Sequence, residues 1–305
     1  MNKLKSLLLT FNLCIVNCLN LSPMDNIIPK IDKQKSNEMK ILINDIKENY
    51  DIPEVSGQIT NFPWRNDKEF LLAKEKYDTP LLLAGFCAVL KNPLPGEEYN
   101  VKLASERMCG KVIKPSKIFS QNSHLGPYTK NKGYKEGATY VGGKIVMGTG
   151  GGVCKIATTL YNLAVLSNLE ILERHNHSMP VNYVPYGQDA TVSYGAKDFK
   201  FKNITNGNIL IWSELIGNRL YMAFYSIEKP PHITWSHEVK DITEPSIKYV
   251  KNENLNPGET KTIIQGLQGA IVKSTITIKY EDGTISIKNM GISKYSPLPE
   301  LIEIN

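Results

Sequence analysis

Residues 148–155 read Gly148-Thr149-Gly150-Gly151-Gly152-Val153-Cys154-Lys155 and run directly into a segment with helical spacing of apolar residues. Three consecutive glycines permit backbone conformations with positive φ, in which neighbouring N–H groups turn toward one point. The following residues, 158–167, place their apolar side chains on one face of a helix. The sequence therefore predicts an α+β domain in which a glycine-rich turn leads into a core helix packed on antiparallel strands.

The cysteine at the start of this helix is a candidate nucleophile. Cys154 meets the positive end of the helix dipole and Lys155 adds a cation, so both features favour the thiolate over the thiol. The backbone amides of Gly151, Gly152 and Val153 are candidates for holding the oxyanion of a tetrahedral intermediate. The turn lacks the Gly-Lys-Ser/Thr ending of a phosphate-binding loop, which disfavours a nucleotide site. A structural turn with a buried thiol is the simpler alternative.

Two histidines, His175 and His177, follow about twenty residues later. A cysteine nucleophile needs a basic partner, and a chain that crosses a helix and returns can deliver one. Because the two histidines lie two residues apart, an extended segment would point both side chains the same way. Asp189 could orient an imidazole or could be a simple turn residue. Cys154 and the histidines could also bind zinc, but no fourth ligand stands at a supporting spacing, so we predict neither a metal nor a cofactor.

The composition limits the classes to which the chain can belong. Its 305 residues are 41% hydrophobic and 22% charged, which fits one or two globular domains. The absence of any apolar run of about 18 residues excludes a polytopic membrane protein. Only four of the 36 basic residues are arginine, so groups that read bases bidentately are scarce and no nucleic-acid partner is predicted. The net charge of +6 favours attraction to an anionic surface.

The pattern along the chain divides it into four parts. Lys3 and Lys5 precede an apolar stretch that ends at Pro23, the layout of an export signal. Turn signals at Gly217-Asn218 and Asp282-Gly283 predict two β-hairpins, whereas 131–152 reads as irregular. The predicted parts are a signal peptide or N-terminal anchor at 1–23, a polar extension and linker at 24–79, a catalytic domain at 80–227 and a small all-β appendage at 228–305.

Several motifs together resemble the VanW domain. They are Gly150-Gly151-Gly152-Val153-Cys154, Thr158-Thr159-Leu160-Tyr161-Asn162, Glu173-Arg174-His175-Asn176-His177-Ser178, Pro180-Val181-x-Tyr183-Val184-Pro185 and Gly187-x-Asp189-Ala190-Thr191-Val192. The flanking motifs Phe119-Ser120-x-Asn122, Gly126-Pro127 and Asp198-Phe199-Lys200-Phe201-Lys202-Asn203 agree. The resemblance covers roughly 80–227, and the remaining tail is similar to the glycine-bearing β appendage that often follows this domain.

The resemblance implies an extracytoplasmic protein, associated with the wall or membrane of a Gram-positive cell envelope, that acts on peptidoglycan stem peptides. Members of the family are identified as L,D-transpeptidases with the motif cysteine as nucleophile, which is Cys154 here. His177 is the preferred base because Ser178 follows it in the most regular motif, and His175 is the second choice. Substrate contacts are expected from Asn122, Lys155, Arg174, Ser178 and Tyr183.

Two positions depart from the family pattern, which usually has Gln after the cysteine and Ser where Ala157 stands. Lys155 replaces that Gln and could alter the thiol pKa or the fit of the substrate. A cysteine peptidase, an amidase or an L,D-carboxypeptidase would use the same residues with water as acceptor. A non-catalytic wall-binding module would need no reactive thiol.

Overall fold

The computed structural model describes residues 50–91, 93, 96–141 and 144–305, and the predicted leader at 1–23 lies outside these ranges. Within them, most of the regular structure is antiparallel strand, together with four α-helices. The described part agrees in outline with the α+β prediction. It contains no helix that is long and apolar enough to cross a membrane.

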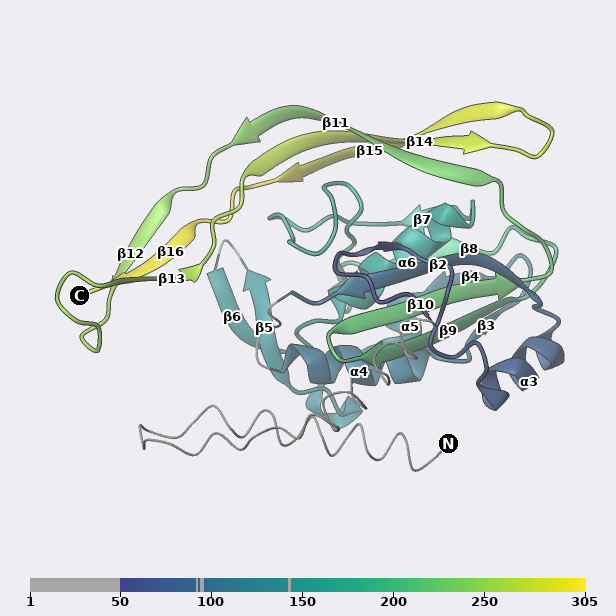
Figure 1. Cartoon of the computed structure of the whole chain (residues 1–305), viewed down its shortest axis with the longest axis horizontal. Coiled ribbons are helices and arrows are strands. Elements are labelled where there is room, and N and C mark those ends of the chain that lie inside the picture. Colours follow the sequence, from purple (N-terminus) through teal and green to yellow (C-terminus); the bar gives the residue numbers. More distant parts are fainter. Residues whose placement is uncertain (1–49, 92, 94–95, 142–143) are drawn as a thin grey trace, which may run out of the picture. The chain divides into compact units, whose positions relative to one another are not determined.

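A five-stranded antiparallel sheet forms the centre of the fold (Figure 1). Its strands in sheet order are β1 (Gly57–Gln58), β2 (Leu81–Val89), β10 (Arg219–Ser226), β9 (Ile209–Ile216) and β3 (Val112–Ile113). β9 and β10 form the hairpin predicted at Gly217-Asn218, where Gly217 adopts a φ of +56°. β10 also pairs with β2, so two segments far apart in the sequence lie side by side.

Both faces of this sheet are covered, which explains the uninterrupted apolar run of β2. Successive side chains of a strand point to opposite faces. Phe86 and Ala88 therefore pack in one cluster with helices α4 (Glu97–Met108) and α6 (Cys154–Leu166). Cys87 and Val89 pack in a second cluster on the other face. A strand that is buried on both faces needs apolar residues at nearly every position.

The second cluster corrects the prediction of a linker before residue 80. Phe62, Trp64 and Phe70 are buried in it, and the Trp64 indole donates a 3.0 Å hydrogen bond to the Tyr225 hydroxyl. Helix α3 (Lys68–Tyr77) starts at a cap in which Asp67 accepts from the Phe70 amide at 3.0 Å. The prolines and polar residues suggested a linker, but widely spaced aromatic side chains supply enough apolar area to close the second face.

Helix α6 is the core helix that the sequence predicted. Its residues from Ile156 to Leu166 are all buried, and it packs on β2 and β10. The helix begins at Cys154, where the sequence places the helix N-terminus, and ends at Leu166, one residue before the predicted end. Because it is buried on all sides, its sequence has no charged residue from Ile156 onward.

The segment predicted to be irregular at 131–152 contains a hairpin. Its strands are β5 (Glu136–Val141) and β6 (Lys144–Thr149), and Gly137 pairs with Gly148. Glycines weaken the strand signal in the sequence, which is why the hairpin was missed. The remaining elements of this part are the three-stranded sheet β4 (Ile118–Ser120), β8 (Lys200–Lys202) and β7 (Glu170–Glu173), helix α5 (Gln121–Leu125) and the 3₁₀ helix η1 (Lys130–Lys132).

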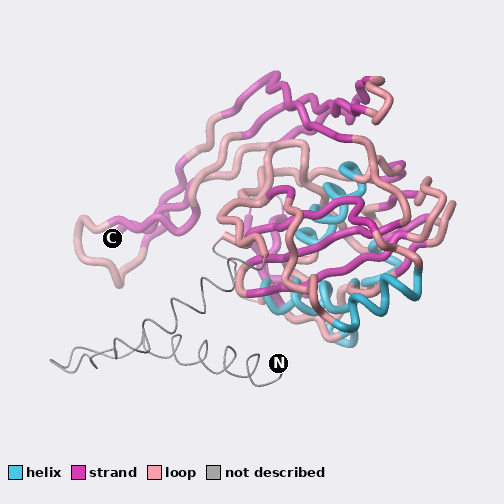
Figure 2. Tube along the Cα trace, turned by 45° about the vertical axis from the view of Figure 1, so that its right-hand side comes forward, coloured by secondary structure: helices cyan, strands magenta, loops and turns pink. Residues whose placement is uncertain are grey.

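Two further three-stranded sheets follow residue 231 (Figures 1 and 2). The first, which we call the C-terminal sheet, is β11 (His232–Thr243), β14 (Gly269–Lys279) and β15 (Ile285–Tyr295). The second is β12 (Ile247–Lys251), β16 (Glu300–Ile304) and β13 (Thr260–Ile264), in which β12 runs parallel to β16.

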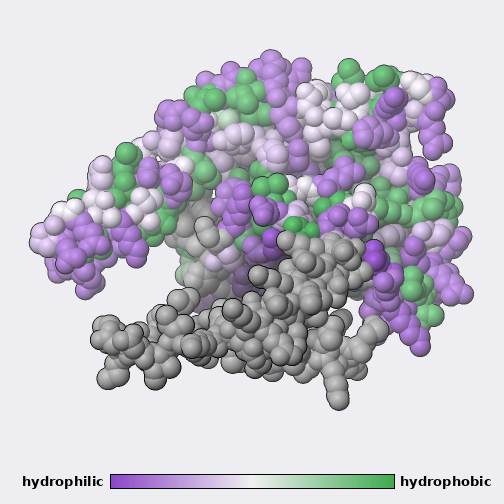
Figure 3. Space-filling model, viewed as in Figure 1, coloured by the Kyte–Doolittle hydropathy of each residue, from purple (hydrophilic) through white to green (hydrophobic). Residues whose placement is uncertain are grey.

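The C-terminal sheet packs on the core with one face. The Asp282-Gly283 turn lies between β14 and β15, as predicted. Ile233, Ile276 and Ile278 of this sheet join the cluster that contains α6. Figure 3 shows hydrophilic and hydrophobic residues interspersed over the outer surface of these strands.

Candidate active site

The glycine-rich turn places Cys154 at the first position of α6. Gly150 and Gly152 adopt φ values of +86° and +102°, a region that favours glycine. A Cβ at Gly150 would lie 2.7 Å from the Tyr128 Cβ, and one at Gly152 would lie 2.7 Å from the Glu97 Cγ. Both the backbone conformation and the lack of space therefore require glycine at these two positions.

The amides of the turn divide into two groups. The Val153 amide donates to the Gly150 carbonyl at 3.3 Å and the Lys155 amide donates to the Gly152 carbonyl at 2.9 Å, so both serve the turn itself. The first N–H groups of a helix have no carbonyl acceptor within the same helix. The Cys154 amide is one of these groups because α6 begins at Cys154. Of the three predicted oxyanion donors, Val153 is thus engaged within the turn.

The Cys154 thiol lies against the loop that follows Asp189. Its Sγ is 3.3 Å from the Thr191 Oγ1 and 3.7 Å from the Val192 carbonyl oxygen. The loop is fixed to α6 because Thr158 Oγ1 donates to the Ala190 carbonyl at 3.1 Å and accepts from the Ala190 amide at 3.0 Å. Thr191 belongs to a quoted motif, but nothing in its sequence context marked it as a neighbour of the nucleophile.

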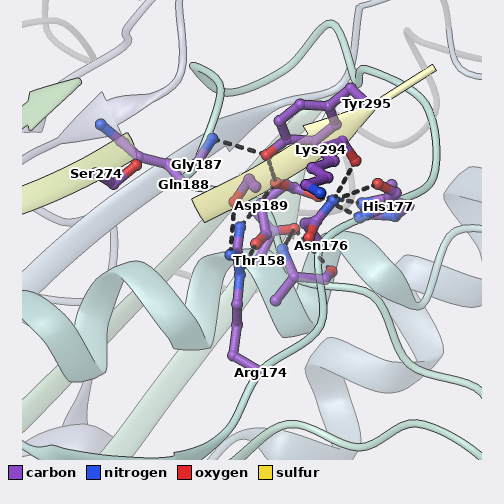
Figure 4. A network of polar contacts seen from close by, with 12 residues as sticks. Thr158, Arg174, Asn176, His177, Gly187, Gln188, Asp189, Ser274, Lys294 and Tyr295 are labelled. Atoms are coloured by element: carbon purple, nitrogen blue, oxygen red, sulfur yellow. Dashed lines mark hydrogen bonds and ion pairs between the residues drawn. The ribbon is translucent and has the colours of Figure 1, made fainter. Parts of the chain in front are cut away.

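His177 connects Cys154 to Asp189. Its Nδ1 lies 2.6 Å from the Asp189 Oδ2, and its backbone amide donates to the same oxygen at 2.7 Å (Figure 4). With Nδ1 engaged, Nε2 is the nitrogen available to the Cys154 thiol, and hydrogen bonding and charge between the two groups act on the pKa of each. The three side chains form a Cys–His–Asp series in which a buried carboxylate orients the imidazole.

Burial and charge act in opposite directions on this pair. Burial by itself raises the pKa of the Cys154 thiol, but the hydrogen bond and charge of His177, with Thr191 and the Val192 backbone, lower it below the ordinary value. Burial by itself lowers the pKa of His177, but Asp189 and Cys154 raise it to about 9. Thiolate and imidazolium therefore stabilise each other.

Asp189 is buried and is held by several donors. Besides His177, its carboxylate accepts from Arg174 Nη2 at 3.0 Å and from the Tyr295 hydroxyl (Figure 4). Arg174 Nε donates to the Asp189 carbonyl at 2.8 Å. Burial raises the pKa of Asp189, yet His177 and Arg174 outweigh it and lower the pKa, so the group stays ionised.

His175 does not share the direction of His177. Its Nε2 lies 3.0 Å from the Glu173 Oε1, and its side chain is 40% exposed. The two rings engage different carboxylates because the chain leaves β7 at Glu173 and continues as an irregular loop, not as the extended segment that was expected. Within the described residues, no group of three His, Cys, Asp or Glu side chains is arranged to hold a metal ion.

The predicted substrate residues separate into inner and outer positions. Arg174 forms an ion pair with Asp189. Tyr183 is buried, and its hydroxyl lies 3.3 Å from the Thr158 Oγ1. Both side chains therefore support the site from within the protein and do not form a surface for substrate. Ser178 is exposed. Asn122 lines an open groove of about 370 Å³ whose other lining residues are Ser123, Glu173, Tyr194, Gly195, Ala196, Lys197, Asp198 and Lys200.

Lys155 also lies in the interior. Its ammonium contacts the Glu97 carboxylate and is 4.8 Å from the centre of the Tyr183 ring, and the two charged side chains are 12% and 10% exposed. Burial lowers the pKa of Lys155, whereas the carboxylate favours the charged form. The cation thus faces Glu97 at the start of α4, and the lowered thiol pKa comes from His177 and the Thr191–Val192 loop.

We expect Lys155→Gln to change stability more than thiol chemistry. Removing the ammonium leaves the Glu97 carboxylate in a mostly buried site, which costs roughly 1–3 kcal/mol of unfolding free energy. Denaturant unfolding measures this loss, and adding Glu97→Gln to Lys155→Gln should recover part of it. The pH profile of Cys154 alkylation should stay close to that of the parent chain, and a clear upward displacement would return Lys155 to an electrostatic role.

Part of the chain matches known proteins. Residues 96–225 match the family described as VanW like protein. The chain is 39% identical over 128 residues to a Bacillus subtilis protein named Uncharacterized protein YoaR, covering 42% of each chain. It is 29% identical over 158 residues to the Enterococcus faecalis protein named Vancomycin B-type resistance protein VanW, covering 50% of this chain and 55% of that one.

The chain spans about half the length of these two curated relatives. Among solved structures, one titled IgA1 Protease G5 domain structure shares 17% identity at a TM-score of 0.17, covering 25% of this chain and 90% of that chain. The match to residues 96–225 confirms the resemblance carried by the motifs around Cys154 and His177. Residues 96–225 of the chain are therefore similar to the VanW-like family in the part that carries Cys154 and His177.

Proposed function

We propose that this protein is a cysteine-dependent acyltransferase, an L,D-transpeptidase that cross-links peptidoglycan stem peptides. The observation that carries the proposal is that His177, whose Nδ1 binds the buried Asp189, lowers the pKa of the Cys154 thiol at the start of α6. The VanW resemblance and the resistance protein among the relatives support a cell-wall substrate and a location in the cell envelope. Residues 80–227 would form the catalytic part and 228–305 an appendage.

The first half of the proposed reaction forms a thioester. The Cys154 thiolate attacks the carbonyl carbon of the diamino-acid residue that precedes the terminal D-alanine, and the carbonyl oxygen becomes an oxyanion. The Cys154 amide, at the first position of α6, together with the Gly152 amide, would hold this oxyanion. The bond to the D-alanine nitrogen then breaks, and the imidazolium of His177 protonates the leaving amine.

The second half transfers the acyl group. An amine from a neighbouring stem peptide attacks the thioester carbon and gives its proton to the neutral His177 ring. The carbon–sulfur bond breaks, an amide cross-link forms, and the thiolate and imidazolium pair is restored. Asp189 keeps the ring oriented in both halves because its Oδ2 binds both Nδ1 and the backbone amide of His177.

The direct test is to incubate the purified full chain with a stem-peptide donor and an amine acceptor. Mass spectrometry should detect loss of D-alanine, a thioester adduct on the peptide that contains Cys154, and a cross-linked product. Loss of D-alanine without a cross-link would identify a carboxypeptidase, and cleavage at another bond would identify a peptidase or amidase. Absence of both turnover and adduct would leave a wall-binding module.

The paired pKa values predict a bell-shaped pH dependence of kcat/KM for D-alanine release. The rate should rise with pH through the Cys154 pKa, which lies below the ordinary value of 9.0, as the thiolate forms. It should fall through about 9, where the His177 ring loses the proton that the leaving amine needs. Initial rates from about pH 4 to 10 measure both limbs. A single rise at the pH of an ordinary thiol would contradict the ion pair.

A further inference from the structure

The last residues of β15 enter the polar network around Asp189. The Tyr295 hydroxyl donates to the Asp189 Oδ1 and accepts from the Gly187 amide at 2.8 Å (Figure 4). Tyr295 is 5% exposed, and it lies 106 residues after Asp189 in the sequence. The C-terminal sheet thus supplies a buried donor to the carboxylate that orients His177.

A second contact from the same strand holds the arginine of this network. Arg174 Nη1 donates to the Ser293 Oγ at 2.8 Å, while Nη2 donates to the Asp189 Oδ1 at 3.0 Å. Ser293 is 2% exposed. Ser293 and Tyr295 lie two positions apart on a strand, so they point to the same face and reach the same ion pair.

The loops on both sides of the network are also bound to residues after 230. Asn176 Nδ2 donates to the Lys294 carbonyl at 2.9 Å, and the Ser296 amide donates to the Ser178 carbonyl at 2.8 Å. The Tyr186 hydroxyl donates to the Gln268 carbonyl at 2.7 Å. The segment that carries His177 is therefore held between α6 and the C-terminal sheet.

We propose that the C-terminal sheet completes the catalytic centre, with Tyr295 as a positioning residue for Asp189 and Ser293 as its counterpart for Arg174. This inference rests on the proposed function, because it assigns a role toward the same Cys–His–Asp series. Oδ1 is fixed by Tyr295 and Arg174, which leaves Oδ2 directed at His177. Without the Tyr295 hydroxyl, Oδ1 of Asp189 keeps only the hydrogen bond from Arg174. The Asp189 carboxylate is then less well fixed and orients the His177 imidazole less firmly.

Several other titratable or charged side chains face Asp189 and Arg174. Around Asp189 and Arg174 the titratable or charged neighbours are His177, Tyr161 on α6, Tyr295 on β15 and His237 on β11. Burial raises the pKa of Tyr161 to about 12 and lowers that of His237. Burial raises the pKa of the Cys154 thiol, and the groups that lower it are His177, Thr191 and the Val192 backbone.

The test uses Tyr295→Phe in the full chain, which keeps the ring and removes only the hydroxyl. We expect kcat for D-alanine release to fall about tenfold with KM unchanged, as for the loss of a hydrogen bond to a charged group. The midpoint of Cys154 alkylation by iodoacetamide, followed by mass spectrometry of its peptide, should move up by roughly half a pH unit. Ser293→Ala should move it the same way by less.

Tyr186→Phe is the matched control because it removes a phenol hydroxyl at the same interface without touching Asp189. It should leave the alkylation profile unchanged, and thermal unfolding of each variant reports the stability effect separately. If Tyr295→Phe gives the same profile as Tyr186→Phe and the parent chain, the positioning role is overturned. Alkylation needs no substrate, so this outcome is distinct from a failure of the parent chain to release D-alanine.

Discussion

Cys154→Ala should abolish D-alanine release and thioester formation while leaving the fold intact. The thiol is the nucleophile of the proposed reaction, and the methyl group of alanine fits the space that the sulfur leaves. We expect turnover to fall below detection, with a denaturant midpoint close to that of the parent chain. Turnover that persists in Cys154→Ala would end the assignment of this residue.

The matched control is Cys87→Ala, because Cys87 is fully buried in the second core cluster. Burial raises the pKa of the Cys87 thiol to about 12, so it carries almost no thiolate at neutral pH. This variant should keep its activity and lose only some stability. Alkylation of the folded protein should label Cys154 far faster than Cys87.

His177→Ala should lower turnover by roughly 10² to 10⁴-fold, the usual contribution of a positioned acid and base. It should also raise the pKa of the Cys154 thiol, since burial then acts on the thiolate without the opposing imidazolium. The alkylation profile of Cys154 and the rate of D-alanine release measure the two effects independently.

His175→Ala provides the neighbouring comparison. The His175 ring contacts Glu173 and is half-buried, so its loss should change the rate by only a few-fold. A larger loss in His175→Ala than in His177→Ala would reverse the assignment. Equal losses with stoichiometric metal in the protein would instead favour a zinc site.

The part of the site around Cys154 and His177 could be predicted because the residues that indicate it lie close together in the sequence. Positive φ at Gly150 and Gly152 requires glycine, and a helix that starts at Cys154 follows directly in the sequence. The motif around His177 lies one helix and one strand further on. Each of these features depends on neighbouring residues, so the sequence alone carries the information.

The parts that were missed depend on contacts between distant segments. Phe62 and Trp64 lie in a polar stretch of the sequence, which gives no sign of a core. Their role follows from their packing on the second face of β2. Lys155 was expected to act on the thiol or the substrate because it follows Cys154, but its ammonium pairs with Glu97 of α4. Tyr295 shows nothing in its local sequence that points to Asp189. Pairings of this kind are set by tertiary packing, which no local periodicity encodes.

The contact between Tyr295 and Asp189 also sets an order of events during synthesis. A ribosome makes the chain from its N-terminus, so Cys154 and His177 emerge long before the strand that ends at Tyr295. If this strand is needed to hold Asp189, the thiol reaches its full reactivity only after this strand has been made and has folded onto the core. A nascent chain that still lacks this strand would then carry a less reactive thiol, protected from premature acylation or oxidation until folding is complete.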